Sequence, residues 1–483
     1  MLCSVVRLSA QPSVVYEQAK EKTKQLLAAY TADRQWVLKE IFMKGNTITK
    51  NYIIHRELPF KKGDSVRADH LIGLFDQARF NLMNTNLFLE ATPTVDSISD
   101  EEIFIRLNFK ERWYIFPLPY FKFIDRNLNQ WLFEQNASLE RVNYGIKFTW
   151  ENLSGRRDQL RFNVINGYNR DFRLYYEKPY SGKKLEHGYF FGAGYSRQRQ
   201  LTYSTEDHKQ IFHPIAIDPR SDFVKSTLLF ELGYTYRRGV RFRHRLGLRY
   251  VQEEISDSVR ILISANSAKG YRPFFPGNNT ALRFAQIDYN FQYLNLNNNA
   301  YPWQGFGFSG DFIHRGFGMA DIQLWQMNIK AGQYWKIGAK NSFSLNGKGI
   351  LKFPFDQPMY NLPLLGYGDW YLRGLEYYVL DGVAGGIISA SLRREMLNIN
   401  VPTIFQKSEK YRKIPVKVIA KVFVDQGAAH HPFSNQGMLN NRWLVTYGCG
   451  LDVLSYYDFV SQIEWSFNQL GENGLFLHVR REF

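Results

Sequence analysis

The spacing of hydrophobic positions divides the chain into two parts. In residues 36–113 apolar residues first alternate with polar ones, then recur at helical spacing over 71–82, then alternate again over 102–110. This order predicts strand, helix, helix, strand and strand, and hence a small α+β domain with one covered sheet face. Beyond residue 141 the pattern becomes a long series of short alternating runs, broken by Gly, Asn, Pro and charged turns.

These runs place apolar rings on one face and polar side chains on the other. In residues 241–250, Arg243 and Arg245 share one face while Phe242, Leu246 and Leu248 share the other. A soluble sheet with one solvated face alternates in the same way. A lipid-facing barrel also needs strands of about 9 to 11 residues, an even strand count and a polar lumen. We count about sixteen runs and therefore predict a membrane all-β fold, a 16-stranded antiparallel transmembrane β-barrel preceded by the small α+β domain.

The composition fits such a barrel and argues against other classes of protein. Aromatic residues make up 16% of the chain although the mean hydropathy is −0.37, and no run of roughly 20 apolar residues could form a transmembrane helix. The net charge of +16 is compatible with nucleic acid, but no recognition helix or RNA-binding signature accompanies the arginines, which favours a wet lumen. Cys3 and Cys449 lie far apart, which argues against a disulfide framework, a zinc ribbon and a redox motif.

The same patterns predict the domain boundaries. Residues 1–10 end in Leu8-Ser9-Ala10 and look like the tail of a secretory signal peptide whose head lies upstream of this start; a disordered terminus is the alternative. Residues 11–35 read as a helix or a tether. The α+β domain follows at 36–113, an aromatic and proline-rich connector at 114–139, and the barrel at 140–483.

A spaced series of residues covers the α+β domain. The series is Gly45-Asn46-x-x-Thr49, Ile54-x-Arg56-Glu57-Leu58, Gly63, Leu82, Asn86-Leu87-Phe88 and Glu111. It resembles a POTRA domain, the periplasmic module of outer-membrane assembly and secretion proteins. An unrelated small α+β domain is the alternative.

One long segment between strands, residues 361–395, carries a single Arg next to Gly, Arg373-Gly374, and is too aromatic to be disordered. Further along, alternation places Phe423 and Asp425 on one strand face, and Gly427 follows two residues after Asp425. A shielded bidentate pair between the loop Arg and the inward Asp would hold the loop inside the lumen. On spacing alone, a solvated Arg and an Asp facing lumen water are equally compatible.

Both segments resemble motifs of the BamA/TamA-type outer-membrane assembly superfamily. Leu372-Arg373-Gly374-Leu375 is similar to its loop motif, Val-Arg-Gly-Phe or Tyr, and Phe423-x-Asp425-x-Gly427 matches its strand motif, Phe-x-Asp-x-Gly. Further similar segments are Tyr144-Gly145, Asn152-Leu153-x-Gly155 and Pro179-Tyr180. The loop leucines depart from the family pattern, and a second acidic partner of the loop Arg is shifted to Glu395 or absent.

The C-terminal residues alternate as well. Leu475, Leu477, Val479 and Phe483 share one face, and the chain stops at an aromatic residue. This pattern resembles the last-strand signal by which outer-membrane barrels are recognised for assembly. Arg481 interrupts the apolar face.

The resemblance implies a protein of the bacterial outer membrane with its POTRA domain in the periplasm. It implies insertion or translocation of polypeptides, with client β-strands templated where the strand near 142–150 meets the strand near 475–483. The implied partners are unfolded outer-membrane or secreted polypeptides, outer-membrane lipid and accessory lipoproteins, and no nucleic acid. A passive pore or surface-antigen barrel remains an alternative. A dedicated two-partner-type secretion transporter is a further one, although such transporters usually carry two POTRA domains.

Signals of enzyme chemistry are weak. Gly307-Phe308-Ser309-Gly310 is followed by Asp311 rather than the glycine pattern of a nucleophile elbow, and it lies in an alternating run. The pair His430-His431 has no identifiable partners for a metal ion. We therefore predict no catalytic site, no cofactor and no metal.

Overall fold

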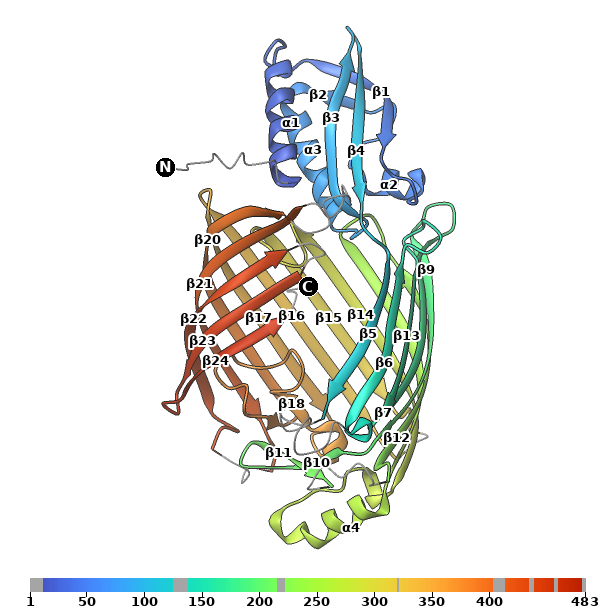
Figure 1. The fold of residues 1–483 in the computed structure, drawn as a ribbon, viewed down its shortest axis with the longest axis vertical. Helices are drawn as coiled ribbons and strands as arrows, with labels where there is room; N and C mark the ends of the chain where they lie inside the picture. Colours follow the sequence, from blue (N-terminus) through green and yellow to red (C-terminus); the bar gives the residue numbers. More distant parts are fainter. Residues whose placement is uncertain are drawn as a thin grey trace.

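The computed structural model describes residues 12–124, 138–214, 222–318, 321–402, 413–433, 438–455 and 459–479. In this part of the chain a small α+β domain sits at one end of a large barrel (Figure 1). The predicted signal remnant at 1–10, and Arg481 and Phe483 of the predicted C-terminal signal, lie outside the described residues.

The α+β domain has the predicted order of elements, with one short extra strand. Its elements are α1 (Pro12–Leu27), β1 (Gln35–Lys44), α2 (Asn51–Glu57), β2 (Ser65–Arg67), α3 (Ala68–Met83), β3 (Phe88–Ile98) and β4 (Glu102–Glu111). The sheet order is β2-β1-β4-β3, with β1 and β4 parallel. Leu71 and Phe75 of α3 are buried with Ile103 and Ile105 of β4, because helical and strand periods bring these apolar positions to the same sheet face.

Within residues 11–35, for which a helix or a tether was expected, Pro12–Leu27 form α1. This helix contacts β3 and α3. The buried Tyr16 donates a hydrogen bond to Asp76 at 2.9 Å, and the Arg79 guanidinium lies 5.0 Å from the centre of the Tyr16 ring. The helix is therefore part of the domain.

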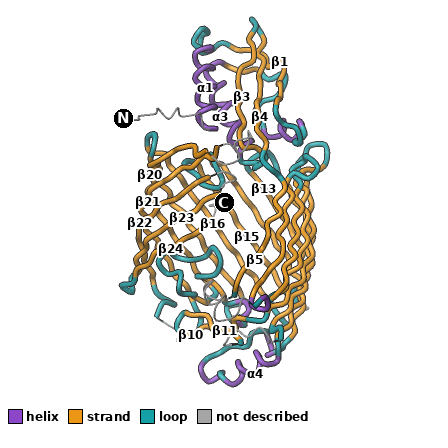
Figure 2. The backbone as a smooth tube through the Cα atoms, in the orientation of Figure 1, coloured by secondary structure: helices purple, strands orange, loops and turns teal. Residues whose placement is uncertain are grey.

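The barrel is one antiparallel sheet of 16 strands in which strands adjacent in the sheet follow one another along the chain (Figures 1 and 2). The strands are β5 (Ile115–Phe123), β6 (Val142–Glu151), β7 (Gln159–Gly167), β8 (Arg170–Ser181), β9 (His187–Gln198), β12 (Lys225–Tyr236), β13 (Phe242–Ile255), β14 (Ala281–Leu296), β15 (Gly305–Arg315), β16 (Leu324–Ile337), β17 (Asn341–Phe353), β20 (Ala384–Pro402), β21 (Lys413–His430), β22 (Trp443–Ser455), β23 (Phe459–Asn468) and β24 (Asn473–Val479). The predicted fold class, a 16-stranded antiparallel barrel, is thus confirmed, although fifteen of the described strands lie beyond residue 141 and the sixteenth, β5, precedes it.

The start of the barrel was predicted wrongly. The sheet begins with β5, inside the segment 114–139 that the sequence assigned to a connector, and β5 pairs with β6 from Ile115↔Trp150 to Phe123↔Val142. Pro117 and Pro119 argue against a strand because proline cannot donate to a ladder. They are accommodated because β5 is an edge strand, where one side of the backbone needs no partner in the sheet.

Strand alternation separates the two barrel faces. Phe230, Leu232 and Leu248 are exposed on the outer face, whereas Arg243 and Arg245 line cavities on the inner face. None of the helices in the described part of the chain is long and apolar enough to cross a membrane.

The barrel end opposite the α+β domain is covered by connecting segments (Figure 1). They include the hairpin β10 (Leu201–Glu206) and β11 (Lys209–His213), helix α4 (Asp257–Ala265), the pair β18 (Pro363–Leu365) and β19 (Leu380–Asp381), and short 3-10 turns at Ser267–Lys269, Pro276–Asn278 and Met359–Asn361; a further 3-10 turn, Leu139–Arg141, precedes β6. Val259, Phe275 and Val383 belong to the apolar cluster that packs these segments together.

Candidate functional site

The loop between β17 and β20 carries Arg373 into the barrel. Arg373 is 4% exposed and Asp425 of β21 is 1% exposed. Arg373 Nε donates to Asp425 Oδ2 at 2.7 Å, the backbone N–H of Arg373 reaches the same oxygen at 3.2 Å, and Nη2 contacts Oδ1. This is the bidentate geometry expected of a shielded Arg–carboxylate pair. The functional role of the pair stays a prediction.

The remaining motif residues surround this pair. The Arg373 guanidinium lies 3.7 Å from the centre of the Phe423 ring, which covers one of its faces. Gly374 has φ +93°, and a Cβ there would lie 3.1 Å from Phe467 O. A Cβ at Gly427 would lie 2.8 Å from Gly386 O and 3.2 Å from the Leu372 side chain. The loop therefore packs directly on the barrel wall.

The second acidic partner of Arg373 was predicted wrongly. It is Glu464 of β23, whose Oε1 lies 3.5 Å from Arg373 Nη1, whereas Glu395 faces Lys417 at 3.8 Å. Ser391 Oγ, on the strand where an acid was expected, lies 3.4 Å from Arg373 Nη2. Glu395 lies farther along β20, beside a register shift. Alternation in β23 gives Glu464 an inward position, but only the curvature of the whole sheet brings that strand to the loop.

We call the contacts of Arg373 with Asp425 and Glu464 the loop lock. The loop lock continues into a series of further buried charges in the lumen. Lys421 Nζ lies 2.7 Å from Glu464 Oε1 and 2.5 Å from Asp452 Oδ1. The Tyr301 hydroxyl donates to Asp452 at 2.7 Å. Charges buried this deeply are tolerated when each has a partner. The loop is thus fixed to β20, β21 and β23 together.

The same loop also holds the last strand from inside. Glu376 Oε1 lies 3.3 Å from His478 Nε2, and the Tyr371 ring stacks on His478 at 5.0 Å between ring centres. Tyr377 contacts the Phe476 ring at 5.4 Å, and Gly374 O accepts a hydrogen bond from Asn468 at 2.8 Å. The inward side chains of β24 therefore rest on the loop. Its outward residues Leu475, Leu477 and Val479 are 70%, 69% and 63% exposed.

The sheet has two edges without a partner among the described residues. β5 pairs with β6 and β24 pairs with β23, and no register joins β5 to β24 in the part of the chain that the structure describes. Figure 1 shows the gap between them. The seam was expected between 142–150 and the last strand, but its first edge is β5, one strand earlier. The described strand β24 ends at Val479, so the Phe483 part of the predicted signal is not placed.

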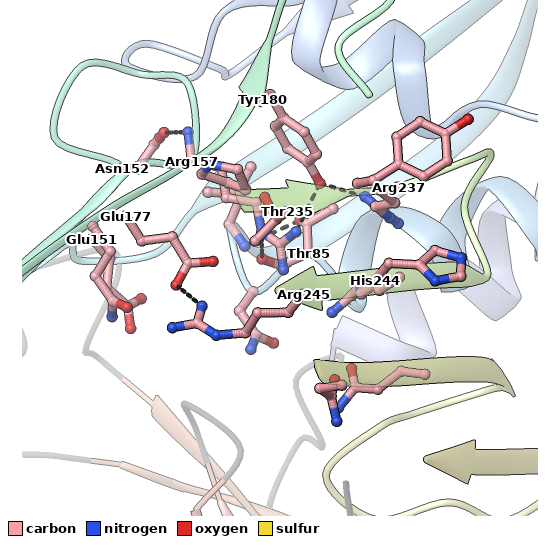
Figure 3. Close-up of a pocket in the computed structure, with 18 residues that line it drawn as sticks. Thr85, Glu151, Asn152, Arg157, Glu177, Tyr180, Thr235, Arg237, His244 and Arg245 are labelled. Carbon is pink, nitrogen blue, oxygen red and sulfur yellow. Dashed lines mark hydrogen bonds and ion pairs between the residues drawn. The ribbon is translucent and has the colours of Figure 1, made fainter. Parts of the chain in front are cut away.

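A second buried charge centre joins the α+β domain to the barrel. Glu57, at the end of α2, is fully buried and accepts hydrogen bonds from Arg237 Nη1 at 2.6 Å and Nη2 at 3.0 Å. Arg56 Nη1 reaches Glu57 at 3.1 Å, and the Tyr180 hydroxyl donates to it at 3.1 Å. Figure 3 shows Tyr180 and Arg237 meeting in this region. The motif residues Arg56 and Glu57 thus meet Tyr180, which the resemblance also singled out.

Other residues of the predicted POTRA motif build this junction. Gly45 has φ +99°, and a Cβ there would overlap Phe109 O at 2.1 Å. Asn46 Nδ2 donates to Thr49 O at 3.0 Å, and Thr49 Oγ1 accepts from Asn152 of the barrel at 3.0 Å. Phe88 is buried in the domain core. The motif therefore shapes the turn that faces the barrel.

Two carboxylates of the α+β domain have low pKa values for different reasons. Burial opposes ionisation of Glu57, but the charge of Arg237 and its hydrogen bonds lower the pKa of Glu57 to about 2. Burial also opposes ionisation of Glu111, whose pKa is nevertheless lowered because Thr49 and Thr47 donate hydrogen bonds to it. Glu57 therefore depends on barrel cations, whereas Glu111 depends on its own domain.

The sheet, its locked inner loop and its apolar outer face define an outer-membrane β-barrel protein. Residues 152–380 match the Omp85 superfamily domain. The chain therefore carries an Omp85 superfamily domain, which agrees with the resemblance to the BamA/TamA-type superfamily that the sequence motifs indicated. At the level of this family, it is a protein of outer-membrane insertion or translocation.

Three solved structures were compared with the chain. BamA from Haemophilus ducreyi lacking POTRA domains 1–3 is 16% identical, with 98% of this chain and 94% of that chain covered and a TM-score of 0.48. CdiB from Acinetobacter baumannii is 14% identical, with 90% and 71% covered and a TM-score of 0.45. CdiB from Escherichia coli is 10% identical, with 99% and 98% covered and a TM-score of 0.44. No curated protein sequence matches the chain.

Proposed function

We propose that this protein inserts polypeptides into the outer membrane, or translocates them across it, by offering unpaired strand edges to a client. In this proposal the α+β domain is a POTRA domain that lies in the periplasm and receives clients. The observation that carries the proposal is the seam: β5 and β24 end the sheet without pairing with each other among the described residues, while the inner loop holds β24 in place.

The physical reason is the absence of water in hydrocarbon. An unpaired backbone N–H or C=O in the bilayer core costs several kcal/mol, so a client strand that reaches this depth gains by pairing with an available edge. The client's own hairpins can then form while its first strand is already satisfied. No chemical catalysis is involved.

The β5 edge supports a weak seam. Successive N–H groups of a strand point to opposite sides, so Pro117 and Pro119 remove two donors from one side of β5. Prolines of edge strands are tolerated on the side that faces away from the sheet. β5 therefore closes poorly onto β24, and the seam stays accessible to a client.

The loop lock supports the same proposal from inside. If β24 had no support, a strand paired on one side only would fray or close irregularly. The contacts of Glu376, Tyr371 and Tyr377 with β24 keep its inward face fixed while its backbone edge stays open. We infer that Arg373 and Asp425 serve insertion by keeping this support in place.

The test is reconstitution of the full chain into liposomes of outer-membrane lipid. The rate at which a urea-unfolded barrel protein becomes protease-resistant is measured with and without the protein, and with a heat-denatured sample as control. Acceleration by the folded protein alone supports the proposal. Absence of acceleration for every substrate, with the protein itself folded, contradicts insertion and favours a dedicated exporter. A large steady conductance in a planar bilayer would favour a passive pore.

A further inference from the structure

A cavity of about 330 Å³ lies inside the barrel next to the α+β domain. Its wall comes from the segment between α3 and β3, from the β6–β7 turn with the adjoining strand ends, and from strands β8, β12, β13 and β14. Figure 3 shows the side chains that line it. Four arginines line it, Arg157, Arg237, Arg243 and Arg245, against two carboxylates, Glu151 and Glu177. The lining is therefore cationic, and its chemistry is separate from the Arg373 lock.

The four arginines differ in what they contact. Arg237 forms an ion pair with Glu57, and Arg245 forms one with Glu177 at 3.2 Å. The Arg157 guanidinium donates to two neutral acceptors among the described residues, Thr85 O at 2.9 Å and the Tyr180 hydroxyl at 2.7 Å. These bonds orient the Arg157 guanidinium without neutralising its charge.

Arg243 is the arginine with the least compensation. Within the described part of the chain, no carboxylate oxygen lies within 4.0 Å of its guanidinium nitrogens. Its partner across the sheet is Gln292, a neutral residue that also lines the cavity. Arg237, which lines the same cavity, carries the same charge. The wall thus presents a guanidinium fork that has no carboxylate within 4.0 Å among the described residues.

The contacts of Glu57 indicate which kind of anion the arginines of this cavity can bind. Its carboxylate already sits beside the cavity and binds two arginines and a tyrosine hydroxyl. The forked geometry of a guanidinium matches the two oxygens of a carboxylate. A cavity of this volume admits such a group together with a short piece of chain.

The geometry points to a binding site in this cavity for a carboxylate of the client polypeptide, held by Arg243 and Arg157. The inference rests on the proposed function, because it assumes that polypeptides pass this end of the barrel beside the α+β domain. The carboxylate has two sources of the same chemistry, an Asp or Glu side chain and the C-terminus of the client. A lipid or free phosphate is a different ligand and is tested as such.

The probes are three dye-labelled peptides of alternating apolar sequence. Two of them have no acidic side chain, and one of these ends in a free carboxylate while the other ends in an amide. The third peptide carries one internal Glu and an amide end. Binding to the full chain in detergent is followed by fluorescence anisotropy. We expect the free-acid peptide to bind roughly tenfold more tightly than the amide. Equal binding of all three peptides would overturn the inference, and a gain for the third peptide alone would assign the site to side chains.

The variants Arg243→Gln and Arg157→Gln should each bring the acid peptide close to the amide peptide. The matched control is Arg249→Gln, on the same strand and face as Arg243, because Arg249 already faces Asp288 at 3.5 Å and Glu231 at 3.7 Å. An equal loss in this control would show a general effect of lumen charge and contradict the site. Shifts in unboiled gel mobility check folding, and Arg157→Gln keeps the test valid if Arg243→Gln does not fold.

Two further measurements separate the possible outcomes. Inorganic phosphate that displaces the acid peptide at lower concentration than acetate would overturn the carboxylate assignment. The same preparations enter the insertion assay. Acid-selective binding without acceleration would contradict the proposed function but not the site, whereas acceleration without acid selectivity would do the reverse.

Discussion

Two buried arginine–carboxylate centres hold this protein together, and their charge balance is opposite. In the loop lock one arginine, Arg373, meets two carboxylates, Asp425 and Glu464. At the domain junction one carboxylate, Glu57, meets two arginines, Arg56 and Arg237. Each centre therefore depends most on its minority charge. Losing Glu57 removes the carboxylate that both arginines share, and losing Arg373 removes the cation that Asp425 binds, whereas Glu464 keeps Lys421 at 2.7 Å.

The two centres also differ in what they connect. The loop lock joins a loop to the wall of its own barrel, and its contacts extend through Glu376 to β24 at the seam. The junction joins two domains and lies beside the arginine-lined cavity. We expect damage to the first to impair insertion, and damage to the second to loosen the α+β domain.

The largest effect is expected for Arg373→Ala. It removes the guanidinium that compensates Asp425, and breaking a buried pair from one side costs about 3 to 5 kcal/mol. Loop and β24 should lose order, and most of the insertion activity should be lost while the barrel still assembles. The measurements are the liposome assay and unboiled gel mobility. The double variant Arg373→Ala with Asp425→Asn should recover part of the stability, and unchanged activity of the single variant would sink the proposed role.

A smaller effect is expected for Glu57→Gln at the junction. The amide keeps the shape but not the charge, so Arg56 and Arg237 repel each other at a cost of roughly 2 to 3 kcal/mol. Hydrogen exchange in α2 should increase, with little change in the barrel strands. Glu40→Gln is the control, because Glu40 forms an exposed pair with Lys62 that is worth about 0 to 1 kcal/mol. Equal exchange in the two variants would contradict the distinction between a buried and an exposed pair.

The pH dependence of the junction follows from the pKa of Glu57. Its ordinary pKa of 4.5 falls to about 2 in the folded protein. The junction is therefore fully stabilised above pH 4.5 and loses this stabilisation as pH falls toward 2. Hydrogen exchange in α2, measured in steps from pH 6 to pH 2.5 and corrected for intrinsic rates, should rise in this window. Glu57→Gln should lack this component of the rise.

The smallest effect is expected for His478→Ala, which removes one contact between loop and last strand. The loss of a hydrogen bond or weak ion pair costs about 1 kcal/mol, so the barrel should stay intact while hydrogen exchange in β24 increases. Leu475→Ala, on the outward face of the same strand, is the control and should not alter the loop. If His478→Ala leaves exchange in β24 unchanged, the aromatic contacts alone hold the strand.

Several residues of both centres could be read from the sequence, but their pairing could be read only in part. Alternation placed Asp425 inward, and the resemblance paired it with Arg373. The resemblance also selected Arg56, Glu57 and Tyr180, yet nothing in the spacing indicated that they meet. Glu464 and Arg237 were missed because their partners lie 91 and 180 residues away along the chain.

The errors at the seam have a similar cause. The prolines of β5 hid a strand that exists only because an edge tolerates them. The position of an edge depends on the closure of the whole sheet and leaves no local signal in the sequence. The sequence also does not show whether Arg243 has a carboxylate close by, because a carboxylate could have come from any neighbouring strand.

Alone, the sequence determined the order of elements in the α+β domain, the class of the barrel and the direction of its side chains. Those features follow from periods of two and 3.6 residues, which act over short distances along the chain. Only the tertiary structure decided which charges are paired, which strands end the described part of the sheet, and which cavity arginines have no carboxylate close by among the described residues. These outcomes depend on contacts between residues far apart in the sequence, and burial makes each such contact decisive because an unpaired charge has no water to replace its partner.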